Sequence, residues 1–411
     1  MDSLRGAQRD RDAGGVIRVR ILHLSTRLIV GGSQENTLLS CRGAADAGHQ
    51  VGLAFGPIYG PEGSLLNDAR SDARVECIEI DALTREVSPL ADLRGHRQVR
   101  RLIRSWKPDV VHTHSSKAGI LGRAAAWHEG VACIVHTIHG LAFHPRESSW
   151  RNWIYARAER WAARRCHAIV SVADAMTVQA LAARIGEPSQ YTTIRSGIDV
   201  DALLAEDTSR ARIRAELGID EGDIVFGTFA RLAEHKGHDD LIDALTPLLA
   251  SRDGPPMRLL WVGDGWWRAR LGERLRGSSI ANRVILTGLV EPSRIGTLLA
   301  ATDVVIHPSY REGLPRAVVQ GLLAGKPAIA YDIDGAREVC VPGETGILVN
   351  PGDLDGLRRG AKWMIAHPHE RRAMGARGNE RFRTEFDWRV MSQRLLALYS
   401  RILASSGRAV E

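Results

Sequence analysis

Residues 303–331, DVVIHPSYREGLPRAVVQGLLAGKPAIAY, carry the clearest structural signal of this sequence. Two short apolar runs, Asp303–His307 and Pro327–Tyr331, flank a segment whose apolar residues recur at helical spacing. Pro315 suits the first turn of that helix, where a backbone N–H has no helical partner in any case. A strand, a helix and a second strand in this order are typical of one unit of a parallel sheet.

The same alternation extends along the rest of the chain. In the first half, strands are predicted at Val16–Leu24, Gln50–Phe55, Val75–Ile80, Asp109–His112, Cys133–Thr137, Ala168–Val172 and Tyr191–Ile194. In the second half, further strands are predicted at Ile224–Phe229, Met257–Val262, Val284–Leu286 and Gly346–Val349. Residues 196–212, SGIDVDALLAEDTSRAR, break the rhythm and predict a connection that ends at a helix cap, Ser209. The pattern therefore predicts two doubly wound α/β domains, followed by helices to about Ala404.

Length and composition agree with two folded domains. A chain of 411 residues exceeds the usual size of one hydrophobic core. Hydrophobic residues at 44% and charged residues at 25% exclude a disordered or collagen-like protein. Five scattered cysteines without a CxxC spacing fit a reducing compartment and no structural zinc. We therefore expect a cytoplasmic protein, and since no apolar run is long enough to span a bilayer, any membrane contact should be peripheral.

The positive charge is concentrated in the first half. Residues 1–200 hold 26 Lys and Arg against 20 Asp and Glu, which gives most of the formal net charge of +7. Such a field suits an anionic partner. A nucleic acid is disfavoured, because the cations are spread over amphipathic helices and no nucleic-acid motif is present.

GGSQ, Gly31–Gln34, follows the first strand and opens a helix. Two glycines there allow the backbone to approach a ligand and present N–H groups to an anion. The same turn is equally compatible with plain helix–strand packing. It is not GxGxxG, so the fingerprint of a nicotinamide dinucleotide is missing.

Histidines follow two neighbouring strands, in HTHSSKAG (His112–Gly119) and HTIHG (His136–Gly140). A metal site is disfavoured because no carboxylate or cysteine completes a ligand set at a familiar spacing. We interpret His112 and His136 as buried, hydrogen-bonded structural residues. For His139, at a strand end before a glycine, contact with a polar ligand is the favoured interpretation over a structural role.

ARLAEHKG, Arg231–Gly237, follows the first strand of the second domain and leads into a helix. Arg231 and Lys236, together with the N–H groups of the helix, could surround a diphosphate. The alternative is a solvated charge pair that caps the helix.

In REGLPRAVVQG, Glu312 precedes Gly313, whose missing side chain permits the close approach of a ligand. Gln320 lies eight residues further along, so that the segment could hold a sugar at one end and a ribose at the other. The alternative, that Glu312 only complements the helix dipole, does not explain the whole string.

Two other patterns are given no functional weight. Acidic DxD triplets at residues 199–201, 332–334 and 353–355 are frequent by chance and lie outside a metal–diphosphate context in the first domain. The segment WRNWIYARAERWAARRC, residues 150–166, places one set of residues on a single helical face: Trp150, Trp153, Ile154, Ala158, Trp161 and Ala162. Core packing of that face is predicted in preference to membrane insertion.

In chain order, GGSQ, HTHSSKAG, HTIHG, ARLAEHKG, VGDG (Val262–Gly265) and REGLPRAVVQGLLAGKP resemble the motifs of family 4 glycosyltransferases. The resemblance extends from Ile17 to about Leu403. It implies the GT-B fold, an α/β architecture of two doubly wound Rossmann-like domains that face a cleft. The acceptor domain would comprise residues 17–205 and the nucleotide-sugar domain residues 206–387, with a helix at 388–405 crossing back to the first domain. Residues 1–16 are expected to form a disordered polar tail.

The resemblance also implies roles for individual residues. Arg231 and Lys236 would hold the donor diphosphate, Glu312 would contact hydroxyls of the donor sugar, and His139 would reach the transferred sugar. The donor-binding residues implied are Gly31, Gly32, Gly263, Gly313, Leu314 and Gln320, and those on the acceptor side are Ser115 and Lys117. The family usually has a second Glu where this chain has Gln320. An amide can still accept from one ribose hydroxyl and donate to another, so we expect this role to survive with weaker donor binding.

Family members are retaining enzymes that generally use no metal, and no cofactor is expected beyond the nucleotide-sugar, which is a co-substrate. This agrees with the chemistry of the leaving group, because cations and helix N–H groups can stabilise the charge that develops on the β-phosphate. Two alternatives stay open. One is a nucleotide-sugar epimerase of the same architecture; the other is an inactive nucleotide-sugar or glycan-binding protein, with Gln320 marking lost catalysis.

The donor and the acceptor are less determined by the sequence. UDP is preferred from its frequency in the family, with a hexose or an N-acetylhexosamine as the sugar. The basic first domain suits a lipid-linked or anionic glycan acceptor in cell-surface polysaccharide or glycoconjugate biosynthesis, beside the inner face of the cytoplasmic membrane.

Overall fold

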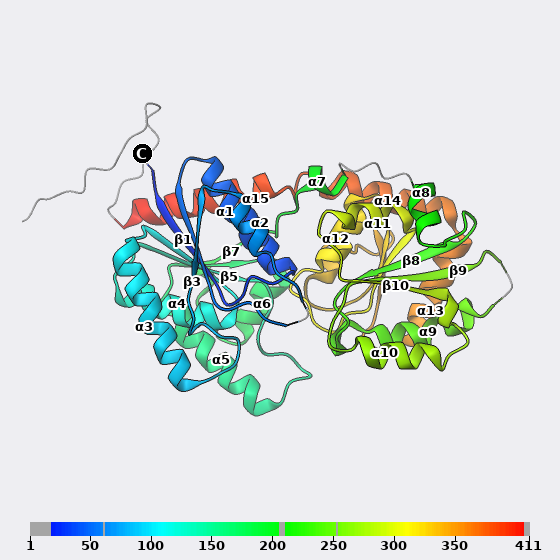
Figure 1. The fold of residues 1–411 in the computed structure, drawn as a ribbon, viewed down its shortest axis with the longest axis horizontal. Helices are drawn as coiled ribbons and strands as arrows, with labels where there is room; N and C mark the ends of the chain where they lie inside the picture. Colours follow the sequence, from blue (N-terminus) through cyan, green and yellow to red (C-terminus); the bar gives the residue numbers. More distant parts are fainter. Residues whose placement is uncertain (1–17, 61, 205–209, 252–253, 407–411) are drawn as a thin grey trace, which may run out of the picture.

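The computed structural model describes residues 18–60, 62–204, 210–251 and 254–406. Two parallel β-sheets lie side by side, each covered by helices on both faces (Figure 1). The tail predicted for residues 1–16, the boundary predicted between residues 205 and 206 and the helix cap at Ser209 lie outside the described residues.

The first sheet has the order β3-β2-β1-β4-β5-β6-β7, and all of its strand pairs are parallel. Its strands are β1 Arg20–Ser25, β2 Gln50–Phe55, β3 Val75–Glu79, β4 Val110–His114, β5 Cys133–Ile138, β6 Ala168–Ser171 and β7 Tyr191–Thr193. Its helices are α1 Gly32–Asp46, α2 Leu66–Ser71, α3 Pro89–Trp106, α4 Ser116–His128, α5 Ser149–Ala163 and α6 Asp174–Ala182, with the 3-10 turn Pro188–Gln190. The strands are close to those predicted because both faces of the sheet are buried, which demands short, continuous apolar runs.

The second sheet has the order β10-β9-β8-β11-β12-β13 and is also parallel throughout. Its strands are β8 Ile224–Phe229, β9 Met257–Val262, β10 Val284–Gly288, β11 Val304–His307, β12 Ala328–Tyr331 and β13 Gly346–Val349. Its helices are α8 Arg210–Glu216, α9 His238–Leu249, α10 Arg268–Arg276, α11 Arg294–Ala301, α12 Arg316–Leu323, α13 Leu354–Ala366 and α14 Pro368–Phe382. The 3-10 turns are Glu234–Lys236, Ala281–Arg283 and Asp334–Glu338. In both sheets the order reverses beside the first strand, which is the doubly wound topology predicted from the alternation.

The carboxyl ends of the two sheets face one another. His139 is the first residue after β5, and Gly313 lies in the loop between β11 and α12. A Cβ atom added to Gly313 would lie 2.0 Å from the carbonyl oxygen of His139, so the two backbones are in contact. Ligands of doubly wound folds bind beyond the carboxyl ends of the strands, and here the loops that follow the strands of both sheets meet at Gly313 and His139.

The predicted connection between the domains contains a short helix, α7 Val200–Leu204. A carboxylate oxygen of Asp199 accepts the backbone N–H of Ala202 at 3.1 Å, and Val200 and Leu203 are buried. The helix was not predicted because one turn is too short to show a hydrophobic period.

The last helix, α15 Trp388–Ser405, returns to the first domain and packs against α1 (Figure 1). Gly43 of α1 makes this packing possible, because a Cβ atom there would lie 2.1 Å from Oγ of Ser392. Further along, the hydroxyl of Tyr399 lies 2.5 Å from Nδ1 of His112 on β4. The crossing of this helix back to the first domain, which the resemblance implied, is confirmed.

The prediction that the tryptophan face of residues 150–166 packs in the core is wrong for its large side chains, although Ala162 of that face is buried. On α5, Trp150 is 63% exposed, Trp153 60%, Ile154 44% and Trp161 44%. The buried side of α5 consists instead of small residues and one ion pair, between Glu159 and Arg123 at 2.6 Å. Periodicity shows which residues share a face, but it does not show which face the sheet covers.

Candidate functional site

The carboxylate of Glu312 is the most strongly constrained charge at the junction of the two domains. Its Oε1 lies 2.5 Å from Nζ of Lys236 and 2.8 Å from Nε2 of His307. Burial by itself would raise the pKa of Glu312, but the adjacent Lys236 and His307 hold that pKa far below its ordinary value. Glu312 is therefore an anion near neutral pH, with both neighbours on one oxygen.

Asp334 holds the backbone of this loop in place. Its Oδ2 accepts the N–H of Glu312 at 2.8 Å, and its Oδ1 accepts from the side-chain amide of Gln179 of the first domain at 3.0 Å. Asp334 has a φ of 45°, a left-handed conformation that is uncommon for a residue with a side chain. It belongs to a DxD triplet that was set aside as a chance pattern, and neither Asp334 nor His307 was among the predicted site residues.

Arg231 follows β8 and reaches toward the first domain. Its Nη1 lies 3.7 Å from Oε1 of Glu62, and Arg27 lies 3.5 Å from the same oxygen. Burial lowers the pKa of Arg231, and the charge of Glu62 opposes that shift. Glu62 is 3% exposed, and its second oxygen has no hydrogen-bond partner within the part of the chain that the structure describes. Glu62 could not be predicted as a site residue, since it lies in a loop without a motif.

Gly263 lies directly beneath Arg231. A Cβ atom at this position would be 2.3 Å from the carbonyl oxygen of Ala230, and its φ is 137°. Close packing of the two loops therefore explains this glycine without a ligand.

In the first domain, His139 begins a row of hydrogen-bonded imidazoles. Its Nε2 lies 3.1 Å from Nδ1 of His114, whose Nε2 lies 3.0 Å from Nδ1 of His23. Burial lowers the pKa of His139 to about 4 and that of His23 to about 3, and the charge of Arg316 also disfavours protonation of His139. His23 and His114 lie in the carboxyl-terminal halves of β1 and β4, His139 directly follows β5, and all three rings are neutral near pH 7.

The two histidines interpreted as structural are indeed buried and hydrogen-bonded. His112 lies 2.7 Å from Oγ1 of Thr137 and also contacts Tyr399, and Nδ1 of His136 lies 2.9 Å from Oγ1 of Thr113.

Three of the buried histidines, His23, His112 and His114, each offer a nitrogen within 4.8 Å of the others, as a metal site requires. Both nitrogens of His112 and both of His114 are already within hydrogen-bond distance of a partner. A metal ion held there would replace some of these hydrogen bonds.

Arg316 occupies the space above the predicted glycine turn. A Cβ atom at Gly32 would lie 2.9 Å from Cδ of Arg316, which reaches across from α12. The guanidinium of Arg316 donates to the carbonyl of Gly197 at 2.6 Å and pairs with Glu35 of α1 at 2.9 Å. The Gly31–Gly32 turn is thus at the interface of the two domains, and the side chain nearest to it is a cation.

The rest of the predicted donor segment lies in the loop before α12 and on α12 itself. Gly313 is in contact with the backbone of His139, and Leu314 is buried in a cluster that includes Val172. Gln320 is half-buried on α12, and within the described residues its side chain makes no hydrogen bond to another predicted site residue.

The two predicted acceptor-side residues have partners within the first domain. Nζ of Lys117 lies 2.5 Å from a carboxylate oxygen of Asp92 and also contacts the carbonyl of Glu86. Oγ of Ser115 lies 2.7 Å from Oγ1 of Thr26. The structure does not bring either of them into contact with Glu312 or Lys236.

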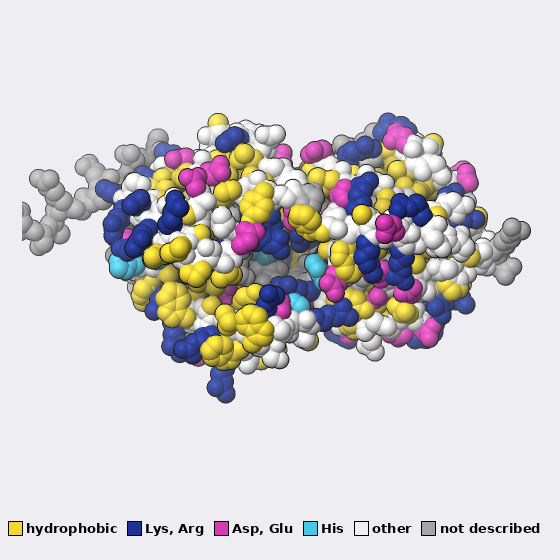
Figure 2. Space-filling model, turned by 60° about the horizontal axis from the view of Figure 1, so that its bottom comes forward, with side chains coloured by type: hydrophobic (Ala, Val, Ile, Leu, Met, Phe, Trp, Pro, Cys, Tyr) yellow, Lys and Arg dark blue, Asp and Glu magenta, His cyan; other side chains and the backbone are white. Residues whose placement is uncertain are grey.

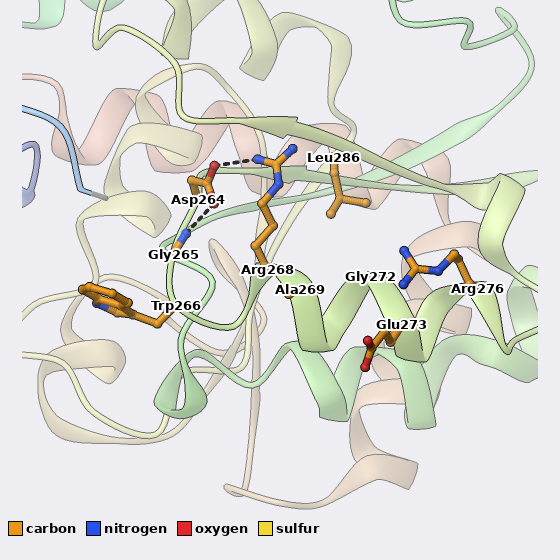
Figure 3. A pocket seen from close by; sticks show the side chains of 9 residues that line it. All are labelled: Asp264, Gly265, Trp266, Arg268, Ala269, Gly272, Glu273, Arg276 and Leu286. Carbon is orange, nitrogen blue, oxygen red and sulfur yellow. Dashed lines mark hydrogen bonds and ion pairs between the residues drawn. The ribbon is translucent and has the colours of Figure 1, made fainter. Parts of the chain in front are cut away.

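Figure 2 shows a hollow between the two halves of the molecule, with basic, acidic and histidine side chains at its rim. A separate pocket of about 620 Å³ lies on the second domain, between the start of α10 and Leu286 (Figure 3). Asp264 of this pocket accepts the N–H of Gly265 at 2.7 Å and pairs with Arg268 at 2.5 Å. None of His139, Arg231, Lys236 and Glu312 lines that pocket. We therefore place the candidate site at the junction of the two domains, where Lys236 contacts Glu312 and Gly313 meets His139.

Two doubly wound domains with facing strand ends, closed by a returning C-terminal helix, define the GT-B architecture. Two family models match this chain: the glycosyl transferase 4-like domain over residues 31–197, and glycosyl transferases group 1 over residues 209–381. Together they cover most of the chain, which belongs to the family 4 glycosyltransferases. It is accordingly a glycosyltransferase.

Curated relatives agree with this class. A UDP-Gal:alpha-D-GlcNAc-diphosphoundecaprenol alpha-1,3-galactosyltransferase of Escherichia coli is 26% identical over 83% of this chain and 86% of its own. A 2-deoxystreptamine glucosyltransferase of Streptomyces kanamyceticus is 28% identical over 74% of this chain and 80% of its own.

Solved structures confirm the fold. HepE of Anabaena in complex with UDP-glucose superimposes with a TM-score of 0.79 at 22% identity, over 93% of this chain and all of that one. Sucrose-phosphate synthase of Thermosynechococcus elongatus gives a TM-score of 0.80 at 20% identity, over 94% of this chain and all of that one.

Proposed function

We propose that this glycosyltransferase moves a hexosyl or N-acetylhexosaminyl residue from a UDP-sugar to a glycan or lipid-linked acceptor, with retention of configuration and without a metal ion. Its place would be the biosynthesis of cell-surface polysaccharides or glycoconjugates. The observation that carries the proposal is the buried Glu312 carboxylate, held by Lys236 and His307 where Gly313 meets His139.

The arrangement of charges supports transfer without a metal. When the bond between the anomeric carbon and the β-phosphate oxygen breaks, its electron pair remains on the phosphate. Arg231 and Lys236 then stabilise that charge as fixed cations. The acceptor oxygen forms its bond to the anomeric carbon on the face that the phosphate leaves, and the acceptor proton passes to a phosphate oxygen. Glu312 and His139 would hold the sugar in place during this exchange.

Glu62 explains how Arg231 is kept ready for the donor. In this structure Glu62 is the counter-charge of Arg231, and it also contacts Arg27. A donor diphosphate carries more negative charge than one carboxylate and can take its place on Arg231, leaving Glu62 paired with Arg27. Binding of the donor would thus exchange one ion pair for another, without leaving a buried charge uncompensated.

The relatives support the choice of donor and acceptor. The E. coli relative is named for UDP-Gal and for an acceptor linked to diphosphoundecaprenol, and HepE was solved with UDP and with UDP-glucose.

A panel of UDP-, GDP- and ADP-sugars tests donor and metal dependence together. We expect one UDP-sugar to raise the melting temperature and to be hydrolysed slowly, with no loss of either effect in EDTA. Loss of hydrolysis in EDTA would refute metal independence, and stabilisation by a GDP- or ADP-sugar alone would refute the choice of UDP. Release of an epimerised sugar would favour the epimerase.

The exposed face of α5 supports peripheral contact with an anionic membrane. Trp150, Trp153, Ile154 and Trp161 lie at helical spacing on the outside, and guanidinium groups lie over the indole rings, with Arg165 3.8 Å from the ring centre of Trp161. Indole rings with neighbouring arginines are typical of the membrane interface, where the rings enter the headgroup layer and the cations meet anionic lipid. No described helix is both long and apolar enough to cross a bilayer.

Sedimentation with vesicles tests this contact. The wild-type protein should sediment with vesicles that contain phosphatidylglycerol and remain in solution with pure phosphatidylcholine. Replacing Trp150, Trp153 and Trp161 by Ala together should reduce binding by about tenfold or more, because three indole anchors are lost. Trp266→Ala removes a tryptophan that is 69% exposed on the second domain and serves as the matched control. Equal binding of the triple variant and the wild type would refute the role of α5.

A further inference from the structure

The three imidazoles behind the candidate site form a hydrogen-bonded row. The ring centres of His23 and His114 are 5.3 Å apart with planes 19° apart, and those of His114 and His139 are 5.4 Å apart with planes 29° apart. Both N···N distances, 3.0 and 3.1 Å, are shorter than the centre distances by about two ring radii. Each pair of facing nitrogens therefore lies close to the line that joins the two ring centres, and so close to the plane of each ring. This is the geometry of a strong hydrogen bond between imidazoles.

The number of protons restricts this row to two states. A neutral imidazole carries one N–H and one lone pair, so each ring can donate on one side only. His114 uses both of its nitrogens, and if it donates to His139 it must accept from His23. If it donates to His23 instead, it must accept from His139. All donors in the row therefore point the same way.

The buried end of the row selects between the two states. Nε2 of His23 has no hydrogen-bond partner among the described residues, and the ring is 0% exposed. If the donors pointed inward, a buried N–H would be left without an acceptor, whereas outward-pointing donors leave only an unused lone pair. Orphaned buried N–H groups are rarer in proteins than under-used acceptors, so the outward direction is favoured.

We infer that His23 and His114 are positioning residues that fix His139 as the tautomer with its proton on Nδ1, the nitrogen turned away from His114. In this state His139 presents a hydrogen-bond donor to a ligand, and it cannot act there as an acceptor. Within the described residues, no hydrogen bond engages Nδ1 of His139.

This inference rests on the proposed function for its consequence. A donated N–H from His139 can bind a hydroxyl or ring oxygen of the transferred sugar without removing a proton from it. The row ends at a buried nitrogen, which gives a proton no route to water. It therefore orients His139 and does not conduct protons through the domain.

Nitrogen NMR of the protein with 15N-labelled histidine tests the tautomer directly, without any substrate. Protonated and unprotonated ring nitrogens have well-separated shifts, and His139→Gln identifies the signal of His139. We expect a protonated Nδ1 in the wild type. In His114→Leu, which has no donor, we expect this preference to be lost. In His114→Asn, whose side-chain amide can donate from the position of Nδ1, we expect it to be kept.

Turnover should follow the same order. With the donor that the panel identifies, kcat should fall about 100-fold in His114→Leu, as when one fixed donor to a transition state is removed. In His114→Asn kcat should recover most of this loss, while KM for the donor changes little in either variant. Thr113→Val is the matched control. Thr113 lies on the same strand as His114, and the change removes the hydroxyl that contacts His136 but leaves the histidine row intact.

A wild-type His139 protonated on Nε2 would overturn the inference, as would an unchanged Nδ1 signal in His114→Leu. If His114→Leu does not fold, His114→Asn still tests the inference. A soluble His114→Asn protein with the wild-type Nδ1 signal supports it, and one without that signal overturns it. If the tautomer is as inferred but no nucleotide-sugar is bound or hydrolysed, the proposed function fails and the tautomer assignment stands.

Discussion

Glu312 shows how one buried residue organises the candidate site. Its carboxylate compensates the charge of Lys236 and accepts from His307, and its backbone N–H is held by Asp334. Removing one member of such a group leaves a buried charge without a partner, which costs more than the lost contact itself. Lys236 and Glu312 therefore hold each other in place.

The cations should dominate the rate of transfer. Lys236→Ala and Arg231→Ala should each lower kcat/KM for the donor by about 100-fold, because each removes a positive charge that the proposed mechanism places at the leaving phosphate. Steady-state assays with the donor found in the panel measure this. Lys362→Ala is the matched control, since Lys362 is exposed on α13. Near-normal turnover of either site variant would show that the diphosphate binds elsewhere.

Residues that belong to a motif could be predicted from the sequence. Residues whose partners are brought together only by the fold could not. Lys236 and Glu312 were predicted from their loops, but their direct contact spans 76 residues of sequence and depends on the pairing of β8 with β11. Glu62 and Arg316 gain their roles only when the two domains meet. His307 had one usable signal, a polar residue at the end of a buried strand.

Among the helices, α15 depends on one specific packing contact, and α5 packs differently from the prediction. The docking of α15 on α1 depends on the absence of a side chain at Gly43, where the two helices meet at Ser392. The helical pattern of α15 was visible in the sequence, but the helix against which it packs was implied by the resemblance alone.

Gly43→Ala should destabilise the protein by about 2 kcal/mol, since a methyl group would overlap Oγ and Cβ of Ser392 and push the helices apart. Urea unfolding measures this free energy. Adding Ser392→Gly to Gly43→Ala should restore part of it by removing the clash. Gly222→Ala, at a glycine with no atom within 4 Å of its added Cβ, should leave the stability unchanged. A Gly43→Ala protein as stable as the wild type would contradict the tight docking.

The helix α5 shows the opposite case, in which the sequence pattern was visible and its interpretation was wrong. A face with three tryptophans was expected in the core, yet α5 packs through Ala156, Ala162 and Ala163 and leaves the tryptophans outside. Small residues let the helix lie close to its neighbours, and no rule of periodicity distinguishes this from core packing of the large face. The strands were predicted more accurately, because a strand buried on both faces has only one possible assignment.

At the scale of the whole molecule, buried neutral histidines link stability to pH. Burial lowers the pKa of His23 and of His238 from 6.5 to about 3, and both side chains are at most 1% exposed. An unfolded chain binds these protons at higher pH than the folded one. The free energy of unfolding should therefore be highest above pH 6.5 and fall as the pH drops below it, by about 1.4 kcal/mol per pH unit for each histidine.

Urea unfolding at a series of pH values between 7.5 and 4.5 measures this slope. His238 has no hydrogen-bond partner for either ring nitrogen among the described residues, so His238→Leu should remove one proton from the linkage and flatten the slope. His369→Leu, at an exposed position on α14, is the control that should leave it unchanged. Stability that is constant from pH 7.5 to 4.5 would contradict the burial of neutral histidines.

The candidate site contains residues of both domains. Each sheet supplies half of the site, with Lys236 and Glu312 from the second and His139 from the first. Their contact depends on glycines that admit neighbouring backbone, as Gly313 does for His139.

The anomeric configuration of the released sugar tests the proposal that transfer is retaining and independent of a metal. A UDP-sugar labelled with 13C at the anomeric carbon can be followed by NMR during slow hydrolysis in EDTA, in the first minutes before the product mutarotates. A retaining, metal-independent site predicts that an α-linked donor first yields the α-sugar. Initial release of the β-sugar would contradict a retaining mechanism, and no hydrolysis until a divalent cation is added would contradict metal independence.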